Sequence, residues 1–328
     1  MAHQLKRPVV AGALLLLLFT AWYAWTLFFT SGDLRYVLVQ SWGSSGTAPG
    51  EFSAPIGVAI GPTGDIYITD SGNNRIQRFR PDGTFVATWG EVGEELGHVN
   101  RPMHAVFGPD GYLYVAEYIN DRIQIFSADG KAIRALGTSG SEPGAFFDAP
   151  GGVAVAPNRE LIVADFYNHR VQRLGSTGAV LGALGTSGRV WNGALHYPTD
   201  VAILSGGDVV VADAYNNRIQ IFGPDGSFQR KWGGPLGLGI PGSWPGWFRV
   251  ATGVAVGPAD RVYVADFDNN RIQVFTADGT LLGVFGDAGD VPARLERPTD
   301  VAVAEDGTIY VVDFGHDRIT VFREQNGE

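Results

Sequence analysis

Short runs of alternating apolar and polar residues recur along most of the chain, and glycine, proline or aspartate bounds each run. A period of two is typical of half-buried β-strands, and Asp-Gly and Pro-x-Gly segments favour tight hairpin turns. In the first unit the pattern predicts an innermost strand at 55–60, two further strands at 65–70 and 75–80, and an outer strand at 84–90. Since no convincing helical period of 3.6 occurs between 34 and 323, this region is predicted to be all-β.

One motif occurs six times: an acidic residue, two variable residues, two mostly polar residues, an arginine and a β-branched residue. Successive arginines lie 47, 48, 48, 53 and 47 residues apart. A period of about 40 to 50 residues, built from short strands, is typical of the blades of a β-propeller. The acid and arginine of each copy are Asp70 and Arg75, Glu117 and Arg122, Asp165 and Arg170, Asp213 and Arg218, Asp266 and Arg271, and Asp313 and Arg318.

These repeated acid–arginine pairs are interpreted as structural. In each copy the acid ends one strand and the arginine opens the next, so the two side chains can form an ion pair across the hairpin and hydrogen-bond to loop amides. A catalytic site is built once, whereas this pair occupies six equivalent places. Function is therefore expected where the units differ from one another.

The outer strand of the blade recurs at 131–137, 179–185, 227–233 and 280–286, which gives five outer strands for six inner sets. The segment 34–43, LRYVLVQSWG, matches the outer-strand segments TFVATWG and SFQRKWG. We therefore expect the N-terminal strand to complete the sixth blade. Such closure removes the open sheet edges that a linear array would expose.

The units resemble NHL repeats, whose pattern appears here as PGGVAV at 150–155 and RVYVADFDNNRIQVF at 261–275. The resemblance covers about nine-tenths of the chain and implies a six-bladed β-propeller. It implies no single function, because the family includes lyases, RNA-binding modules, kinase sensor domains and interaction platforms.

The segment 9–30 is an uncharged, largely apolar run of 22 residues, and Lys6 and Arg7 precede it. As a helix it would be roughly 33 Å long, which is enough to cross a bilayer. The basic residues place the first eight residues in the cytoplasm. We predict a single-pass signal anchor in the inner membrane of a bacterium. The alternative is a signal peptide cleaved near Thr30-Ser31-Gly32.

The anchor also predicts how the chain is divided and oriented. Residues 31–33 form a short linker, 34–323 form a periplasmic propeller, and 324–328 form a tail. The strand 34–43 must begin on the face that carries the hairpin turns such as 61–64, and the linker reaches only roughly 10 Å. That face is therefore expected to lie toward the membrane, and the opposite loop face is expected to point away from it.

The third residue of each innermost strand alternates between glycine and a polar group. Inner strands surround the axis of a propeller, so the three polar groups should converge from alternate blades. One imidazole and two carboxylates can bind a divalent cation or supply a general base. Alternatively, these groups cap loop amides or are solvated in a wide, water-filled channel. In chain order the residues are Gly57, His104, Gly152, Asp200, Gly253 and Asp300.

A comparison with peptidylglycine α-amidating lyases, which the repeats also resemble, weakens a lyase interpretation. The zinc-binding histidines of those enzymes directly follow the proline that opens the inner strand. None of the residues at these positions here can supply an imidazole. They are Ile56, Met103, Gly151, Thr199, Thr252 and Thr299.

The connection before the fifth blade, 234–250, has 17 residues, whereas the other connections of this class have 11 or 12. It carries Trp244, Trp247 and Phe248, and Trp191 lies in the preceding connection. Loops often carry recognition, and exposed aromatic residues are frequent interface anchors. We predict that these four residues bind a protein partner on the loop face. The alternative is that the long connection folds back to plug the channel or to cap blade four.

Composition narrows the function further. The absence of cysteine excludes disulfides and thiolate metal sites, and a formal net charge of −10 is a poor match for nucleic acid. The chain has no complete nucleophile triad, phosphate-binding loop or strong metal motif. The leading hypothesis is a non-catalytic interaction module, for example an accessory subunit of a membrane protein complex, without a cofactor. The alternative is a lyase or hydrolase that uses a divalent cation at the channel mouth.

Overall fold

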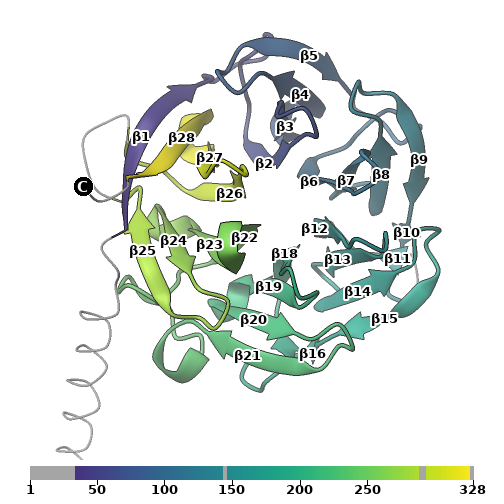
Figure 1. Cartoon of the computed structure of the whole chain (residues 1–328). Helices are drawn as coiled ribbons and strands as arrows, with labels where there is room; N and C mark the ends of the chain where they lie inside the picture. The colour runs from purple at the N-terminus through teal and green to yellow at the C-terminus, as the bar shows by residue number, and fades with distance from the viewer. Residues whose placement is uncertain (1–33, 143–145, 288–292, 326–328) are drawn as a thin grey trace, which may run out of the picture.

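The computed structural model describes residues 34–142, 146–287 and 293–325. Within these ranges, six four-stranded antiparallel sheets surround a central axis as the blades of a propeller (Figure 1). The predicted all-β, six-bladed architecture is therefore confirmed. Most strands begin and end within one residue of the predicted positions, because the alternation of apolar and polar residues and the turn residues define them locally.

The first three blades are each built from strands that are consecutive in the chain, with the first strand nearest the axis. Blade one contains β2 (Pro55–Ile60), β3 (Ile66–Asp70), β4 (Arg75–Phe79) and β5 (Phe85–Trp89). Blade two contains β6 (Pro102–Phe107), β7 (Leu113–Glu117), β8 (Arg122–Phe126) and β9 (Ala132–Leu136). Blade three contains β12 (Pro150–Val155), β13 (Leu161–Asp165), β14 (Arg170–Leu174) and β15 (Val180–Leu184).

The remaining blades follow the same order, except that the last takes its outer strand from the start of the propeller. Blade four contains β18 (Pro198–Ile203), β19 (Val209–Asp213), β20 (Arg218–Phe222) and β21 (Phe228–Trp232). Blade five contains β22 (Ala251–Gly257), β23 (Arg261–Asp266), β24 (Arg271–Phe275) and β25 (Leu281–Phe285). Blade six contains β26 (Pro298–Val303), β27 (Thr308–Asp313), β28 (Arg318–Gln325) and β1 (Arg35–Trp42).

Short elements that the sequence did not predict lie in the connections and turns. Two parallel strand pairs occur between blades: β10 (Thr138–Ser139) with β11 (Phe146–Phe147), and β16 (Thr186–Ser187) with β17 (Ala194–Leu195). The 3-10 turns are η1 (Ser71–Asn73), η2 (Ala214–Asn216), η3 (Pro235–Gly237), η4 (Pro258–Asp260), η5 (Phe267–Asn269) and η6 (Phe314–His316).

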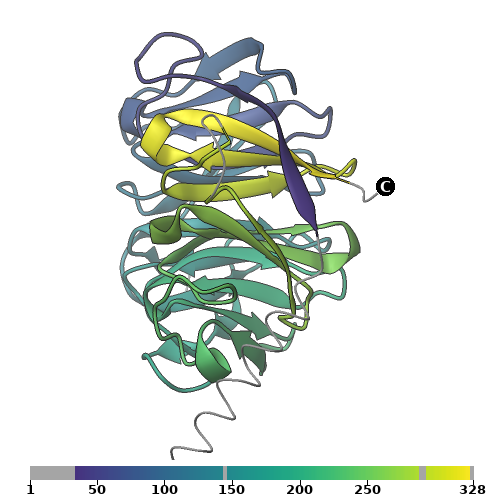
Figure 2. The same cartoon turned by 90° about the vertical axis from the view of Figure 1, so that its left-hand side faces the viewer.

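The N-terminal strand closes the ring as predicted. β1 pairs antiparallel with β28, and Arg35 lies opposite Gln325 at one end of the pair. Figure 2 shows β1 crossing the outer edge of the sixth blade. The ring of Tyr36 packs against Phe285 of blade five, with centroids 4.4 Å apart. β28 extends two residues beyond the predicted end of the propeller because its last residues pair with the first residues of β1.

Apolar side chains fill the spaces between neighbouring blades. Between blades four and five, for example, Val210 and Ile219 pack with Phe248 and Phe275 in one buried cluster. Since strands alternate in direction, all connections between blades emerge on the same side of the ring as the 3-10 turns such as η1. We call this side the loop face.

None of the helical segments in the described ranges is long and apolar enough to cross a membrane. The predicted anchor at 9–30 and the linker at 31–33 lie outside the described residues. The anchor and its location remain predictions.

Candidate functional site

All six repeated acids form an ion pair with the arginine five residues later. The arginine Nε lies 2.6–2.9 Å from a carboxylate oxygen, and each acid is fully buried. These distances are those of charge-assisted hydrogen bonds. Because the same arrangement occurs in every blade, it is a feature of the scaffold.

The pair in blade one shows what the motif holds together. Asp70 Oδ1 accepts a hydrogen bond from the Ser53 amide at 2.8 Å. The guanidinium of Arg75 donates to the carbonyl oxygens of Thr47, Ala48 and Glu51 at 2.7–2.9 Å. The motif therefore fixes the connection that enters the blade, in addition to joining the two strands.

At the axis, each glycine of the alternating ring makes room for the polar residue of the following blade. A Cβ built on Gly152 would lie 2.2 Å from Asp200 Oδ1, and one on Gly253 would lie 2.7 Å from the Cα of Asp300. A Cβ on Gly57 would lie 3.0 Å from the Cα of His104. The glycines of the alternating ring are therefore required by the close approach of the next inner strand, whose backbone lies within 3.0 Å of each Cβ position.

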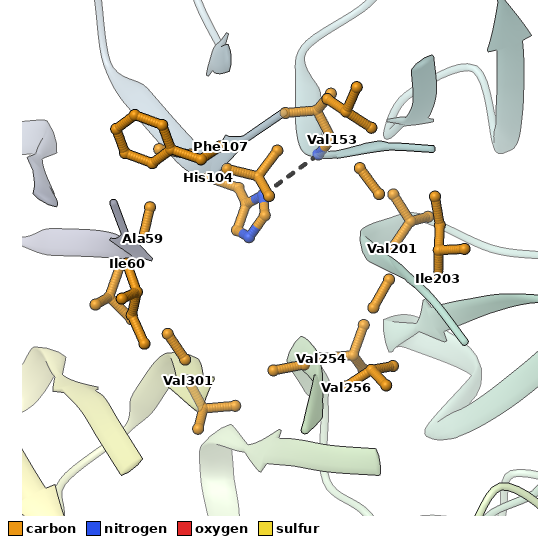
Figure 3. Close-up of a pocket in the computed structure, with 18 of the residues that line it drawn as sticks. Ala59, Ile60, His104, Phe107, Val153, Val201, Ile203, Val254, Val256 and Val301 are labelled. Carbon is orange, nitrogen blue, oxygen red and sulfur yellow. Dashed lines mark hydrogen bonds between the residues drawn. The ribbon is translucent and has the colours of Figure 1, made fainter. Parts of the chain in front are cut away.

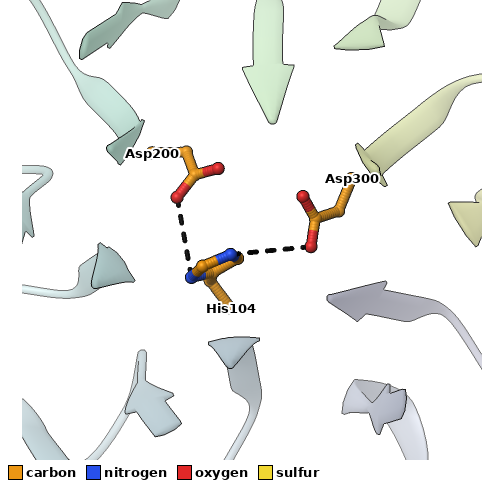
Figure 4. Close-up of side chains that lie close together, drawn as sticks. All are labelled: His104, Asp200 and Asp300. Carbon is orange, nitrogen blue, oxygen red and sulfur yellow. Dashed lines mark ion pairs between the residues drawn. The ribbon is translucent and has the colours of Figure 1, made fainter. Parts of the chain in front are cut away.

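The structure brings His104, Asp200 and Asp300 together, as predicted (Figure 4). The imidazole lies between the two carboxylates, with Nδ1 3.6 Å from Asp200 Oδ1 and Nε2 3.7 Å from Asp300 Oδ2. We call these three residues the axial cluster. Both distances exceed the 2.7–3.2 Å of a direct N–H···O hydrogen bond.

Backbone amides satisfy part of the axial cluster. Asp200 Oδ2 accepts a hydrogen bond from the Val254 amide and Asp300 Oδ2 accepts one from the Val58 amide, both at 2.9 Å and both from the following blade. Asp200 Oδ1, in contrast, is buried without a hydrogen-bond partner. The carboxylates therefore cap backbone amides, as one of the two interpretations of the sequence expected. Asp200 Oδ1 nevertheless faces the space between the three side chains without a hydrogen bond.

Burial changes the protonation behaviour of the axial cluster. Loss of solvent raises the pKa of Asp200 to about 7, and it also raises the pKa of Asp300. Burial alone would lower the pKa of His104, but the two carboxylates outweigh that effect and the pKa of His104 is raised. The cluster therefore holds protons more tightly than the same groups would in water.

The two carboxylates are not solvated in the channel, as one interpretation of the sequence allowed. Asp200 and Asp300 are only 3% and 2% exposed. A cavity of about 100 Å³ lies on the side of the cluster toward the strand starts, where Thr199 and Thr252 help to line it. On the other side, a cavity of about 290 Å³ is walled mainly by Val, Ala and Ile side chains, and His104 borders both cavities (Figure 3).

The second residue of the inner strand has a structural role in three blades. Thr199 Oγ1 donates to the carbonyl oxygen of Thr252 at 2.7 Å, and Thr299 Oγ1 donates to that of Ile56 at 2.8 Å. Thr252 Oγ1 likewise donates to Pro298 at 3.2 Å. These hydroxyl groups join neighbouring inner strands where the amidating lyases have histidines.

The aromatic residues predicted to bind a partner do not all reach the surface. Trp191 and Trp244 are 80% and 59% exposed. Phe248 corrects the prediction: it is fully buried and packs on Phe275 at a centroid distance of 5.7 Å. Trp247 is partly buried beside Trp244. Among the described residues that line the two channel cavities, none comes from 234–250, so the long connection does not plug the channel.

Sequence reasoning missed four members of a row of aromatic side chains on the loop face: Tyr118, Phe166, Tyr167 and Tyr215. Tyr118 and Tyr167 share a hydrogen bond between their hydroxyl groups at 2.7 Å, and Phe166 packs on Tyr197 at 4.9 Å. Tyr197 continues to Tyr215 at 5.0 Å. The sequence feature that could have revealed this row is the pair of residues after the repeated acid. At least one residue of the pair is aromatic in most blades, but its identity varies from blade to blade.

The model of the NHL repeat matches five segments of the chain, which lie in every blade except blade two. The matched residues are 52–79, 147–174, 195–222, 248–275 and 295–322. No curated protein matches the chain.

Several solved structures are similar to this propeller. A catalytically inactive virginiamycin B lyase from Staphylococcus aureus with quinupristin is 17% identical, covering 89% of this chain and 88% of that chain, with a TM-score of 0.59. A gluconolactonase from Xanthomonas campestris is 14% identical over 90% of both chains, with a TM-score of 0.63. A protein of unknown function from Bacteroides thetaiotaomicron is 15% identical, covers 89% of this chain and 76% of that chain, and has a TM-score of 0.69. Identities this low show a shared fold alone. The chain is a six-bladed β-propeller of the NHL-repeat family.

Proposed function

We propose that this propeller is a protein-interaction module that binds its partner through the loop face over blade four. One observation carries the proposal: seven large apolar side chains are 45–80% exposed in two adjacent connections and the turn between them. Contiguous exposed apolar surface is uncommon on monomeric proteins and often marks a binding site. We call these residues the blade-four surface: Val190, Trp191, Tyr215, Leu236, Leu238, Ile240 and Trp244.

Hydrogen bonds hold the parts of this surface side by side. Asn216, in the turn of blade four, donates to the Gly188 carbonyl in one connection at 3.1 Å. Its neighbour Asn217 donates to the Gly239 carbonyl in the other connection at 3.4 Å. Arg271 of blade five donates to the Trp244 carbonyl at 2.9 Å. The surface is therefore largely ordered before a partner binds, which lowers the entropic cost of association.

Charge indicates what kind of partner fits. Neither 186–197 nor 233–250 contains an aspartate or glutamate, although the whole chain has a formal net charge of −10. The charged residues of the two segments are Arg189 and Arg249. A protein that presents apolar side chains flanked by acidic groups would be complementary to this surface.

The proposal includes an extracytoplasmic location at the inner membrane. Its support is the uncharged run 9–30 that follows Lys6 and Arg7. β1 begins on the side of the ring opposite the loop face, and Arg35 is its first residue. A short linker from an anchor would therefore leave the blade-four surface directed away from the bilayer and accessible to a partner subunit.

A photo-reactive amino acid placed at 244 or at 191 in the membrane-anchored chain tests the proposal. We expect cross-links to one heterologous protein at both positions. Val92 is the matched control, because it is 65% exposed but lies in the connection before blade two. The proposal is wrong if the position-92 probe captures the same protein equally well, if the cross-links join only two copies of this chain, or if the probes label lipid alone.

A lyase or hydrolase at the channel mouth is supported less well. The cavity that all three residues of the axial cluster border has a volume of about 100 Å³, and of the three only His104 borders the cavity of about 290 Å³ on the other side. Sites for small-molecule ligands are typically about 300–1,000 Å³. The axial cluster could still bind an ion, for which the available space is sufficient.

A further inference from the structure

The axial cluster combines two buried carboxyl groups with incomplete hydrogen bonding. The side chains of Asp200 and Asp300 are both 4% exposed. Asp200 Oδ1 has no hydrogen-bond partner, and it is directed toward the imidazole of His104. Removing carboxylates from water is costly unless a positive charge or sufficient hydrogen bonds compensate for it. The cluster therefore lacks a partner for its free oxygen.

A direct ion pair with protonated His104 explains the geometry only partly. Charge-assisted N–H···O bonds are typically about 2.7–2.9 Å long. The two contacts of the imidazole with Asp200 and Asp300 are 3.6 and 3.7 Å. In addition, the Val153 amide is directed at Nδ1 from 3.4 Å, where a hydrogen bond would need an unprotonated nitrogen (Figure 3).

These distances suit an ion placed between the three groups. One ligand atom from each residue can be chosen so that all three lie within 4.8 Å of one another. Ligands in a tetrahedral zinc site, with bonds of about 2.0–2.2 Å, lie about 3.4 Å apart. The side chains therefore need only small rotations to reach bonding distance.

We propose that His104, Asp200 and Asp300 bind one divalent transition-metal ion, such as Zn²⁺ or Mn²⁺, on the axis of the propeller. The imidazole nitrogen favours such ions over Ca²⁺ and Mg²⁺, which prefer oxygen ligands. Two carboxylates balance the charge of the ion. The cavity of about 100 Å³ that borders all three side chains leaves room for a water molecule as a fourth ligand.

The ion would connect three alternate blades at the axis, since the three ligands come from β6, β18 and β26. The threonine and backbone bonds described above join neighbouring blades only. Metal binding should therefore stabilise the ring as a whole. The proposal is independent of the blade-four surface, which lies on loops that do not border the cluster.

Calorimetric titration of chelator-treated full-length protein with ZnCl₂, MnCl₂ and CaCl₂ tests the proposal. We expect one Zn²⁺ or Mn²⁺ per chain, weaker binding of Ca²⁺ and a raised melting temperature with the preferred ion. Asp200→Asn and His104→Gln should each weaken binding by more than about 100-fold, because loss of an outer partner alone costs about 10–100-fold. Binding of Co²⁺ should give visible absorption bands that His104→Gln removes.

His316 provides a matched control. It also lies between two carboxylates, with Nδ1 2.9 Å from Asp313 Oδ2 and Nε2 3.4 Å from Glu296 Oε2, but its side chain is 35% exposed. His316→Ala should leave metal affinity unchanged. Three results would overturn the proposal: no binding of either ion by the wild-type protein, unchanged affinity in folded Asp200→Asn, or loss of the site in His316→Ala. The titration of the wild-type protein tests whether the site binds metal even if a variant does not fold.

Discussion

Asp200 Oδ1 occupies the space that a side chain on Gly152 would need, since a Cβ built there would lie 2.2 Å from that oxygen. The Cα of Asp200 and the Thr199 carbonyl oxygen lie 2.6 and 3.0 Å from the same point, so movement of the aspartate side chain alone would not relieve the clash. The inner strands of blades three and four are therefore in direct contact at the axis.

Gly152→Ala should reduce the free energy of unfolding by about 1–3 kcal/mol, the usual range for overpacking a well-packed interior. Urea denaturation followed by circular dichroism measures the change. Gly206→Ala is the control, because no atom lies within 4 Å of its Cβ position. An equal effect of the two substitutions would mean that contact at the axis does not constrain position 152.

Arg218→Ala should destabilise the protein by about 3–5 kcal/mol, because it leaves the buried carboxylate of Asp213 without its cation. Arg218 is itself fully buried and also donates to the Ala194 carbonyl. Arg323→Ala removes an exposed ion pair with Asp306 and should change stability by less than about 1 kcal/mol. Denaturant unfolding of both variants makes the comparison. Similar losses would contradict a special role for the repeated arginine.

Deletion of residues 1–43 should expose the edge of β28 and cause self-association, because an unpaired strand can pair with another chain. Loss of Tyr36 and Leu38 would also uncover apolar residues between blades five and six. Light scattering and size-exclusion chromatography detect the change. Deletion of residues 1–33 alone keeps β1 and should leave the soluble propeller monodisperse. A monodisperse, stable product of the longer deletion would contradict the closure argument.

Tyr114 should remain protonated at a pH where an exposed tyrosine ionises. Burial and a 2.9 Å hydrogen bond to Asp110 raise its pKa to about 12. Because the folded-state pKa is higher than the unfolded value of about 10, this stabilising contribution is complete below pH 10 and is lost as the pH rises through 12. Ultraviolet titration and stability measurements at alkaline pH test this. In Tyr114→Phe this part of the pH dependence should disappear.

Local sequence patterns predicted the fold because they act within each blade. The period of the arginines gave the number of blades, and the match of 34–43 with other outer strands gave the ring closure. The pairing of Asp70 with Arg75 followed from their positions at the two sides of a hairpin. Each of these three features can be recognised within one repeat or by comparing equivalent positions of different repeats.

The environment of the candidate sites depends on contacts between units, which a single sequence does not provide. Phe248 is a residue type that often anchors interfaces. Its position in the connection, however, directs its side chain into the core between blades four and five. Similarly, the alternation of glycine with His104, Asp200 and Asp300 was visible, whereas the closeness of the inner strands that buries these groups was not. Neither the length of a loop nor the type of its residues determines which of its side chains are buried.

The way in which β1 closes the ring has a mechanical consequence. In the first five blades the outer strand is joined covalently to its own sheet, but β1 is held to blade six by hydrogen bonds and side-chain packing. Arg35 and Gln325 lie opposite each other at one end of this pair. A force that pulls these two residues apart would break the hydrogen bonds one after another, as in a zipper, and would not load them together in shear. Tension between the two ends of the propeller would therefore open the ring first at this seam.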